Sequence, residues 1–258
     1  MGQAGTLDAV LRRDRRATVL TLVTVVVLAW GYLLLGAGMD MGSAMAGMTM
    51  PVAWSPGHAA LMVVMWVLMM LAMMLPSAAP MILLHGTVSR RRDPERGGRR
   101  ALLFAVAYAA VWGGFAIVAT AAQWALEQAG VLTPAMSVRT ATAASLLFIA
   151  AGIYQFTPLK RACLRHCRSP LEFLAAHWRG GASGAFAMGV RHGAYCLGCC
   201  WAMMLLLFVG GVMNLAWIAG LALLVLAEKL MPAGQVVSWV LGAGLIGWGV
   251  VGLVAVAV

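Results

Sequence analysis

The sequence predicts an all-α protein, a polytopic bundle of about seven transmembrane helices. Of the 258 residues, 63% are hydrophobic and only 10% are charged, whereas a soluble domain averages about 25% charged residues. The hydrophobic residues gather in runs long enough to cross a hydrocarbon core of roughly 30 Å. The basic residues lie in short clusters between these runs. We therefore expect a multi-pass membrane protein with little mass outside the lipid bilayer.

The apolar runs predict the helices in chain order. They cover residues 17–36, 59–84, 101–124, 140–157, 195–212, 214–231 and 236–258. The first run is too long for the apolar part of a signal peptide, so it is predicted to be a membrane anchor. The fifth and sixth runs are separated only by a short segment containing Gly210 and Gly211. They are expected to form a tight hairpin, which leaves six spans if it is re-entrant. Glu228 and Lys229 then mark the interfacial end of the sixth run.

The basic residues predict the orientation of the chain. Basic residues flanking membrane spans are enriched on the cytoplasmic side. If the N-terminus is cytoplasmic, the clusters at 90–100 and 160–191 are also inside, and of 18 Lys and Arg only Arg139 is outside. We therefore expect a cytoplasmic N-terminus. The net charge of +10 is explained by this pattern, so no nucleic-acid partner is expected.

Two parts are expected along the chain. Residues 1–57 form an N-terminal anchor helix and an outer loop rich in Met and Gly, and residues 58–258 form a polytopic metal-binding membrane domain. Thioethers stay unprotonated and bind Cu(I), so the loop is a candidate segment for metal capture, unless its Met content is only compositional bias. The candidate capture residues are Met39, Met41, Met45, Met48 and Met50.

The second apolar run is unusually rich in methionine. On a helix, one arc of about 80° carries His58, Met62, Met65, Met69 and Met73. A second narrow arc carries Met70, Met74 and Met81. Pro76 and Pro80 follow the Met-rich section and predict a kink. The first arc is predicted to be a stripe of soft metal ligands, and the alternative is that methionine fills gaps in a packed core.

The fifth apolar run carries the sharper geometry. The candidate metal ligands of this helix share one face within about 100°, and they are His192, Cys196, Cys199, Cys200 and Met203. Cys163 and Cys167 follow the fourth run on the same side of the membrane. Two thiolates three or four residues apart can share one ion, and Cu(I) accepts two or three soft ligands. We therefore predict a metal cluster at the cytoplasmic end of this helix.

Other uses of the cysteines stay open. They could be small packing residues, or they could hold a structural Zn ion that staples a scaffold for a membrane complex. Cys196 and Cys199 could also exchange disulfides with Cys163 and Cys167 in a membrane thiol-disulfide relay. No Ser/His/Asp set, phosphate loop or paired intramembrane carboxylate is recognisable, so the protein is not expected to be an enzyme. In the inner loop 158–193, Ser169 and Pro170 predict the start of a short amphipathic helix.

Three segments resemble a known bacterial family. They are Met-Met-Leu-Ala-Met-Met-Leu-Pro-Ser-Ala-Ala-Pro at 69–80, the segment 152–167 that ends in Cys163-Leu-Arg-His-Cys167, and His192-Gly-Ala-Tyr-Cys196-Leu-Gly-Cys199-Cys200-Trp-Ala-Met-Met with its continuation to Asn214. They are similar to uncharacterised proteins described as predicted metal-binding integral membrane proteins, over roughly residues 55–230. The resemblance implies a multi-pass protein of the bacterial inner membrane that handles copper. A copper protein or a copper chaperone is then the expected partner.

Overall fold

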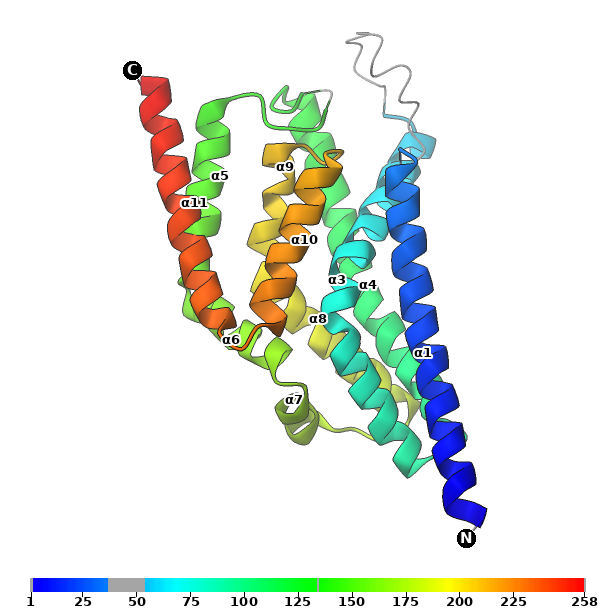
Figure 1. Cartoon of the computed structure of the whole chain (residues 1–258). Helices are drawn as coiled ribbons and strands as arrows, with labels where there is room; N and C mark the ends of the chain where they lie inside the picture. Colours follow the sequence, from blue (N-terminus) through cyan, green and yellow to red (C-terminus); the bar gives the residue numbers. More distant parts are fainter. Residues whose placement is uncertain (1, 37–53, 134, 258) are drawn as a thin grey trace.

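A computed structural model of the chain describes residues 2–36, 54–133 and 135–257 and shows an all-α bundle, as predicted (Figure 1). Its helices, in chain order, are α1 (Gly2–Leu34), α3 (Pro56–Arg92), α4 (Gly97–Gln128), α5 (Ala141–Gln155), α6 (Pro158–Arg168), α7 (Pro170–His177), α8 (Gly181–Leu205), α9 (Leu207–Gly210), α10 (Leu215–Leu230) and α11 (Gly234–Ala257).

Each predicted apolar run corresponds to a helix, but fewer than seven helices are long enough to cross a membrane. Five described segments have the length and apolar character of a span, namely Arg16–Leu34, Pro56–Arg92, Gly97–Gln128, Gly181–Gly210 and Gly234–Ala257. Helices α5 and α6 together give a sixth, bent by 65° between Gln155 and Pro158. Helix α10 has 16 residues and a length of about 24 Å, short of a core of roughly 30 Å. The described residues therefore give five spans, or six if the α5–α6 pair is one span, which is fewer than the seven expected.

Helix α8 begins much earlier than the sequence predicted. It starts at Gly181 rather than near residue 195, because Arg191, His192 and several glycines lower the hydropathy of its first turns. The predicted inner loop 158–193 is therefore largely helical, consisting of α6, α7 and the first half of α8. Cys196 consequently lies in the middle of α8, and the prediction that the cysteines sit at the end of this helix is wrong.

The short helix predicted after Ser169 is confirmed. Helix α7 has Pro170 at its first position and Ser169 as its N-cap residue, although the Ser169 side chain makes no capping hydrogen bond. The expected tight hairpin between the fifth and sixth runs is also present. Gly211 ends α9 with φ of +90°, a left-handed conformation that favours glycine, and the Asn214 side chain caps α10 by accepting from the Trp217 amide.

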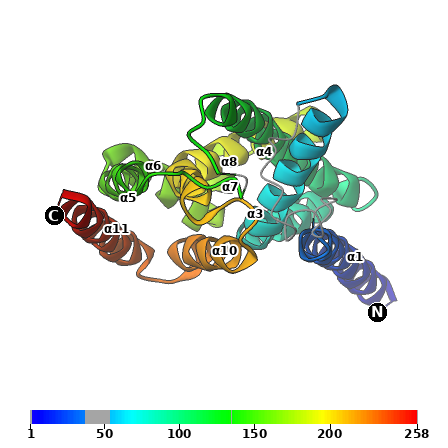
Figure 2. The same ribbon diagram turned by 90° about the horizontal axis from the view of Figure 1, so that it is seen from above.

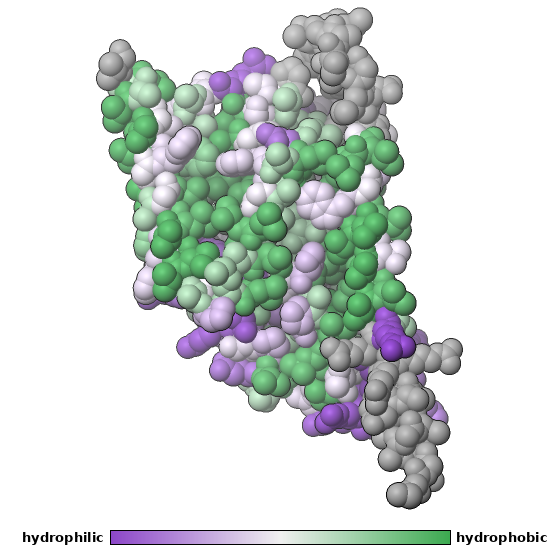
Figure 3. Space-filling view, viewed as in Figure 1, coloured by the Kyte–Doolittle hydropathy of each residue, from purple (hydrophilic) through white to green (hydrophobic). Residues whose placement is uncertain are grey.

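The basic clusters lie at one end of the bundle. The N-terminal end of α1, the turn between α3 and α4, and helices α6 and α7 are all at the lower end in Figure 1. The connection between α4 and α5, which contains Arg139, and the C-terminal end of α11 are at the opposite end. Figure 3 shows apolar side chains over the flank of the bundle and hydrophilic side chains along its lower edge. The basic clusters thus lie at the same end of the bundle as the N-terminus, as the predicted orientation requires.

Helix α3 occupies the interior of the bundle. It packs against α1, α4 and α10, and α4 packs in turn against α8 (Figure 2). Helices α5 and α11 form a separate pair on one flank, and α6 packs against α8. Through Pro76 and Pro80, α3 remains one continuous helix. The fold thus brings α3, α6, α8 and the end of α10 together around one buried region.

Candidate metal centre

Four thiols and one thioether meet in this buried region. They belong to Met74 on α3, Cys167 on α6, and Cys196, Cys199 and Cys200 on α8, and we call these five residues the sulfur cluster. Each of them is at most 9% exposed. All five cysteines of the chain are free thiols, so the cluster is in the reduced state.

Two pairs of sulfur atoms are especially close. Cys199 Sγ lies 3.9 Å from Cys167 Sγ, and Cys200 Sγ lies 3.8 Å from Met74 Sδ. Cys196 lies on the same face of α8 as Cys199 and Cys200, three and four residues earlier. With a metal–sulfur bond of roughly 2.3 Å, as at zinc thiolates, two sulfurs that share one ion are at most about 4.6 Å apart. Both pairs therefore already have the spacing that a shared ion needs.

A centre with more ligands is not formed. Within residues 2–36, 54–133 and 135–257, no group of three or more His, Cys, Asp and Glu side chains is arranged to hold a metal ion. Two of the thiols are turned back along α8, because Cys199 Sγ and Cys200 Sγ donate to the Cys196 carbonyl at 3.1 and 3.0 Å. The arrangement thus offers sulfur pairs rather than a tetrahedral cage.

The spacing of the cysteines on α8 explains how they share one face. Cys196, Cys199 and Cys200 are three or four residues apart, so they project from the same side of the helix. Helix α6 brings Cys167 to that side because it packs closely on α8 at Gly198. A Cβ atom built at Gly198 would lie 2.7 Å from Cys163 Sγ, so any larger residue here would require the Cys163 thiol or α6 to shift. Cys163 thereby lies against the α8 backbone, beside the sulfur cluster.

Polar groups complete the surroundings of the cluster. Lys229 Nζ donates to Cys196 Sγ at 3.0 Å and to Ser77 Oγ at 3.2 Å, and it lies 3.8 Å from Met74 Sδ. Tyr108 Oη hydrogen-bonds with Cys196 Sγ at 3.0 Å. Lys229 is 5% exposed, and among the described residues it forms no ion pair with a carboxylate. A buried ammonium requires a compensating partner, and the group nearest to it here is the Cys196 thiol. The cluster is therefore suited to carry negative charge.

Glu228 and Lys229 lie in the last turn of α10, as predicted, but both are buried inside the bundle. Both side chains point into the protein, and Glu228 is 1% exposed. Its carboxylate accepts from Lys160 Nζ at 2.7 Å and from Ser238 Oγ at 2.9 Å. The end of α10 is therefore tied to α6 by a buried ion pair and to α11 by a hydrogen bond, and these connections hold Lys229 beside the cluster.

The predicted methionine stripe faces the core. Met62, Met65, Met69 and Met73 are at most 1% exposed, and the distance from the first to the last along the helix is about 16 Å. At the end remote from the cluster, the Gln123 amide contacts Met62 Sδ at 3.6 Å and Met136 Sδ at 3.3 Å. The stripe thus lies along a buried face of α3 and ends one residue before Met74.

The remaining predicted ligands are not among the five residues of the sulfur cluster. His58 is at the far end of α3, where its ring meets the edge of the Trp54 ring at 5.1 Å. His192 is 2% exposed and lies among the rings of Phe104, Tyr108 and Phe173. Met203 is buried on α8, one turn beyond Cys199. The candidate capture residues Met39, Met41, Met45, Met48 and Met50 fall outside the described residues.

Sequence reasoning missed four groups at the site, namely Met74, Ser77, Tyr108 and Lys229. Met74 lies on the second methionine arc, for which the sequence predicts no role as a ligand. Lys229 carried a signal, because a charged residue inside an apolar membrane segment marks a functional site by default. Nothing in the sequence distinguishes Tyr108 from other aromatic residues of α4.

Comparison with known proteins places the chain in a family. A family model named PpoB2 and described as a copper chaperone matches residues 63–252. The chain belongs to the PpoB2 family. This match confirms the predicted copper-linked family, and it includes every residue of the sulfur cluster and Lys229. His58, Met62 and the outer loop lie outside the PpoB2 match. No curated protein and no solved structure matches the chain.

Proposed function

We propose that this protein binds Cu(I) as cargo at the sulfur cluster and delivers it to copper proteins from the bacterial inner membrane. The observation that carries the proposal is the pair of short sulfur–sulfur distances, 3.9 Å for Cys167–Cys199 and 3.8 Å for Met74–Cys200. The description of the PpoB2 family as a copper chaperone supports the choice of metal. The protein then acts by binding and transfer, with no catalysed reaction.

The ligand set favours Cu(I) over zinc. Thiolates and thioethers are soft ligands that select Cu(I), whereas a structural zinc site is four-coordinate and closed. Charge adds to this preference. A Cu(I) ion on two thiolates carries one negative charge, which the Lys229 ammonium 3.0 Å from Cys196 Sγ balances. A divalent ion on the same ligands would leave one positive charge buried, which is costly in a low-dielectric interior.

The methionine stripe supplies a route for the ion. Each thioether is neutral and a weak ligand, so an ion can pass between neighbours without a deep trap. Met62 to Met73 and then Met74 connect the far end of α3 to the sulfur cluster, and all of them are buried. We propose that the outer loop captures the ion, that the stripe conducts it, and that the N-terminus lies in the cytoplasm. The gathering of the basic clusters at one end of the bundle (Figure 1) supports this orientation.

A thiol-disulfide relay is the second candidate, and one observation favours it. Cys167 Sγ and Cys199 Sγ, at 3.9 Å, need to approach by only about 2 Å to reach the length of a disulfide bond. Burial of both thiols opposes exchange with an external partner, because disulfide exchange requires access to the attacking thiolate. The relay therefore ranks below copper binding.

Metal content and Cu(I) competition on the reduced, detergent-purified protein test the proposal. The wild type is compared with Cys196→Ser/Cys199→Ser and with Cys163→Ser as a matched control, because Cys163 lies beside the cluster on α6. We expect tight Cu(I) binding in the wild type and the control, and its loss in the double variant. Stoichiometric zinc would contradict the proposal, and absence of metal together with an easily trapped Cys167–Cys199 disulfide would favour the relay.

A further inference from the structure

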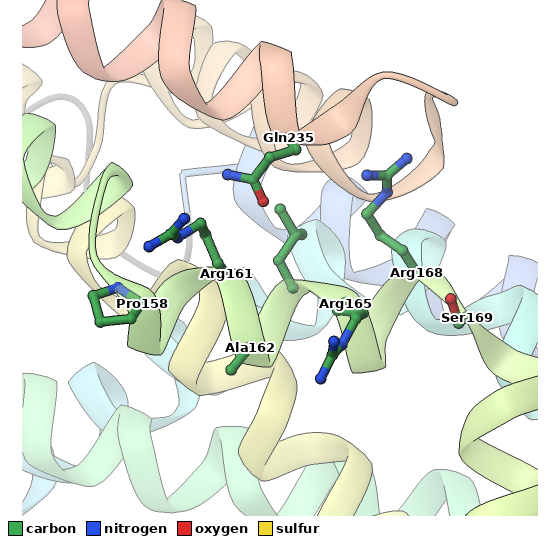
Figure 4. Close-up of a pocket in the computed structure, with 8 residues that line it drawn as sticks. Pro158, Arg161, Ala162, Arg165, Arg168, Ser169 and Gln235 are labelled. Atoms are coloured by element: carbon green, nitrogen blue, oxygen red, sulfur yellow. The ribbon is translucent and has the colours of Figure 1, made fainter.

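Helix α6 has a second functional face. Cys163 and Cys167 face α8, while the basic residues Arg161, Arg165 and Arg168 line a pocket between α6 and the start of α11 (Figure 4). The pocket has a volume of about 560 Å³, which is within the range of small-molecule sites. The remaining lining includes Ser169 and Gln235 and no acidic side chain.

The positive charge of this pocket is not balanced by the protein. In the part of the chain that the structure describes, Arg161, Arg165 and Arg168 form no ion pair. The closest buried carboxylate on the adjoining end of α10, that of Glu228, is already paired with Lys160. Three arginines lining one cavity make its electrostatic potential positive, which favours binding of an anion.

Two groups are already positioned for such a ligand. The Arg168 guanidinium donates to the carbonyls of Met231 and Pro232 at 2.6 and 2.5 Å, which fixes it at the rim of the pocket. Gln235 Nε2 is buried and has no hydrogen-bond partner among the described residues. A buried donor without an acceptor is costly, and an oxygen of a bound anion would satisfy it.

The position of the pocket indicates the source of the anion. Helix α6 turns away from α5 by 65° at the level where the hydrophilic edge begins in Figure 3. Next to the pocket, Phe156 and Leu159 are 43% and 59% exposed, as expected for side chains in contact with acyl chains. Basic pockets between membrane helices bind phosphate-bearing lipid head groups, and arginine matches phosphate geometry in a bidentate manner.

We propose that Arg161, Arg165, Arg168 and Gln235 bind the phosphate of an anionic phospholipid head group. The site is separate from the sulfur cluster, and the proposal does not depend on copper binding. Because α6 also carries Cys167, a bound head group fixes the helix that supplies this thiol to the cluster.

Native mass spectrometry of the full chain in detergent tests this site. The wild type, Arg161→Gln/Arg165→Gln, and the control Arg91→Gln/Arg179→Gln are each mixed with phosphatidylglycerol or phosphatidylcholine. The control removes the same charge from exposed positions at the same end of the bundle, outside the pocket. Arg168 is kept because it ties α6 to the connection before α11.

We expect the wild type and the control to retain phosphatidylglycerol in preference to phosphatidylcholine. The pocket variant should lose about fivefold in affinity for each arginine removed, the size expected for one basic side chain at an anionic surface. Inorganic phosphate is added separately. Phosphate that binds the wild type but not the pocket variant, without any lipid preference, would keep the site and make a free anion its ligand. Equal retention of both lipids by the wild type, with no phosphate binding, would overturn the proposal whether or not the variants fold.

Discussion

The ammonium of Lys229 lies 3.0 Å from the sulfur of Cys196, so a charged side chain at the end of α10 contacts the central thiol of the cluster. Replacing it by methionine removes the charge and roughly preserves the volume. We expect Lys229→Met to weaken Cu(I) binding at least tenfold, because the negative charge of the copper–thiolate unit loses its counter-charge in a low-dielectric interior.

Cu(I) competition measures this effect, with Ser77→Ala as the control. Ser77 also contacts the Lys229 ammonium, at 3.2 Å, but its loss leaves the charge in place. The control should bind Cu(I) within a few-fold of the wild type. If Lys229→Met binds Cu(I) as tightly as the wild type, Lys229 has no role in balancing the charge of the bound ion.

The packing of α6 on α8 at Gly198 gives a second prediction. Gly198→Ala places a methyl group 2.7 Å from Cys163 Sγ, and we expect α6 to move away from α8 to relieve this contact. This shift should lengthen the Cys167–Cys199 contact and lower both thermal stability and Cu(I) affinity. Overpacking of this kind typically costs about 1–3 kcal/mol.

A second substitution should reverse this loss. In Gly198→Ala/Cys163→Ala the offending sulfur is gone, and the nearest remaining atom is Cys163 Cβ at 3.5 Å, an ordinary van der Waals contact. Cu(I) affinity should return towards the wild-type value. Failure of the rescue, with Cys163→Ala alone also defective, would mean that Cys163 binds the ion itself.

The ion pair of Lys160 and Glu228 gives a third prediction. Its two side chains are fully enclosed, with exposed fractions of 0% and 1%. Breaking a buried pair leaves one uncompensated charge, so Glu228→Gln should destabilise the protein by about 3–5 kcal/mol. Thermal unfolding in detergent measures this loss. The partly exposed pair Arg100–Asp93 is the comparison, where Asp93→Asn should cost about 1 kcal/mol or less.

The charge reversal Lys160→Glu/Glu228→Lys adds a check that separates charge from shape. It restores an ion pair but places each group on the other helix. Recovery of stability relative to Glu228→Gln would show that the pairing of opposite charges, rather than the shape of the side chains, accounts for most of the stabilisation. A stability of Glu228→Gln equal to that of the wild type would contradict the buried pair.

The helical faces of this site could be read from the sequence, but the contacts between helices could not. Cys196, Cys199 and Cys200 share a face because helical geometry fixes their spacing, and that prediction is confirmed. The partner of this face is set by tertiary packing. Met73 and Met74 are adjacent and equally apolar, yet only Met74 has a sulfur 3.8 Å from Cys200 Sγ.

The surroundings of charged residues in apolar runs are the other feature that the sequence does not give. Hydropathy averages over a window, so it treats Glu228 and Lys229 as the end of a span and Arg191 and His192 as part of a loop. In the folded chain the first two are buried by pairing with Lys160 and the thiols, and the latter two lie within α8. Neither outcome follows from local composition, because each depends on residues more than 30 positions away or on helix packing.

Met74 provides the test that separates the sulfur cluster from the methionine stripe. Met74→Leu is close to isosteric, so it should cost less than about 1.5 kcal/mol of stability while removing the thioether 3.8 Å from Cys200 Sγ. We expect Cu(I) affinity at equilibrium to fall several-fold. Met188→Leu, a substitution of a buried Met on α8, should leave it unchanged.

The stripe should behave differently. Met65→Leu/Met69→Leu removes two thioethers from the middle of α3 without touching the cluster, so equilibrium affinity should stay near the wild-type value. Entry of Cu(I) into the protein reconstituted in liposomes should instead become slower, which stopped-flow mixing with a Cu(I) donor outside the vesicles can follow. Unchanged entry rates in this variant, beside a clear loss of affinity in Met74→Leu, would restrict copper chemistry to the sulfur cluster and leave the stripe as packing.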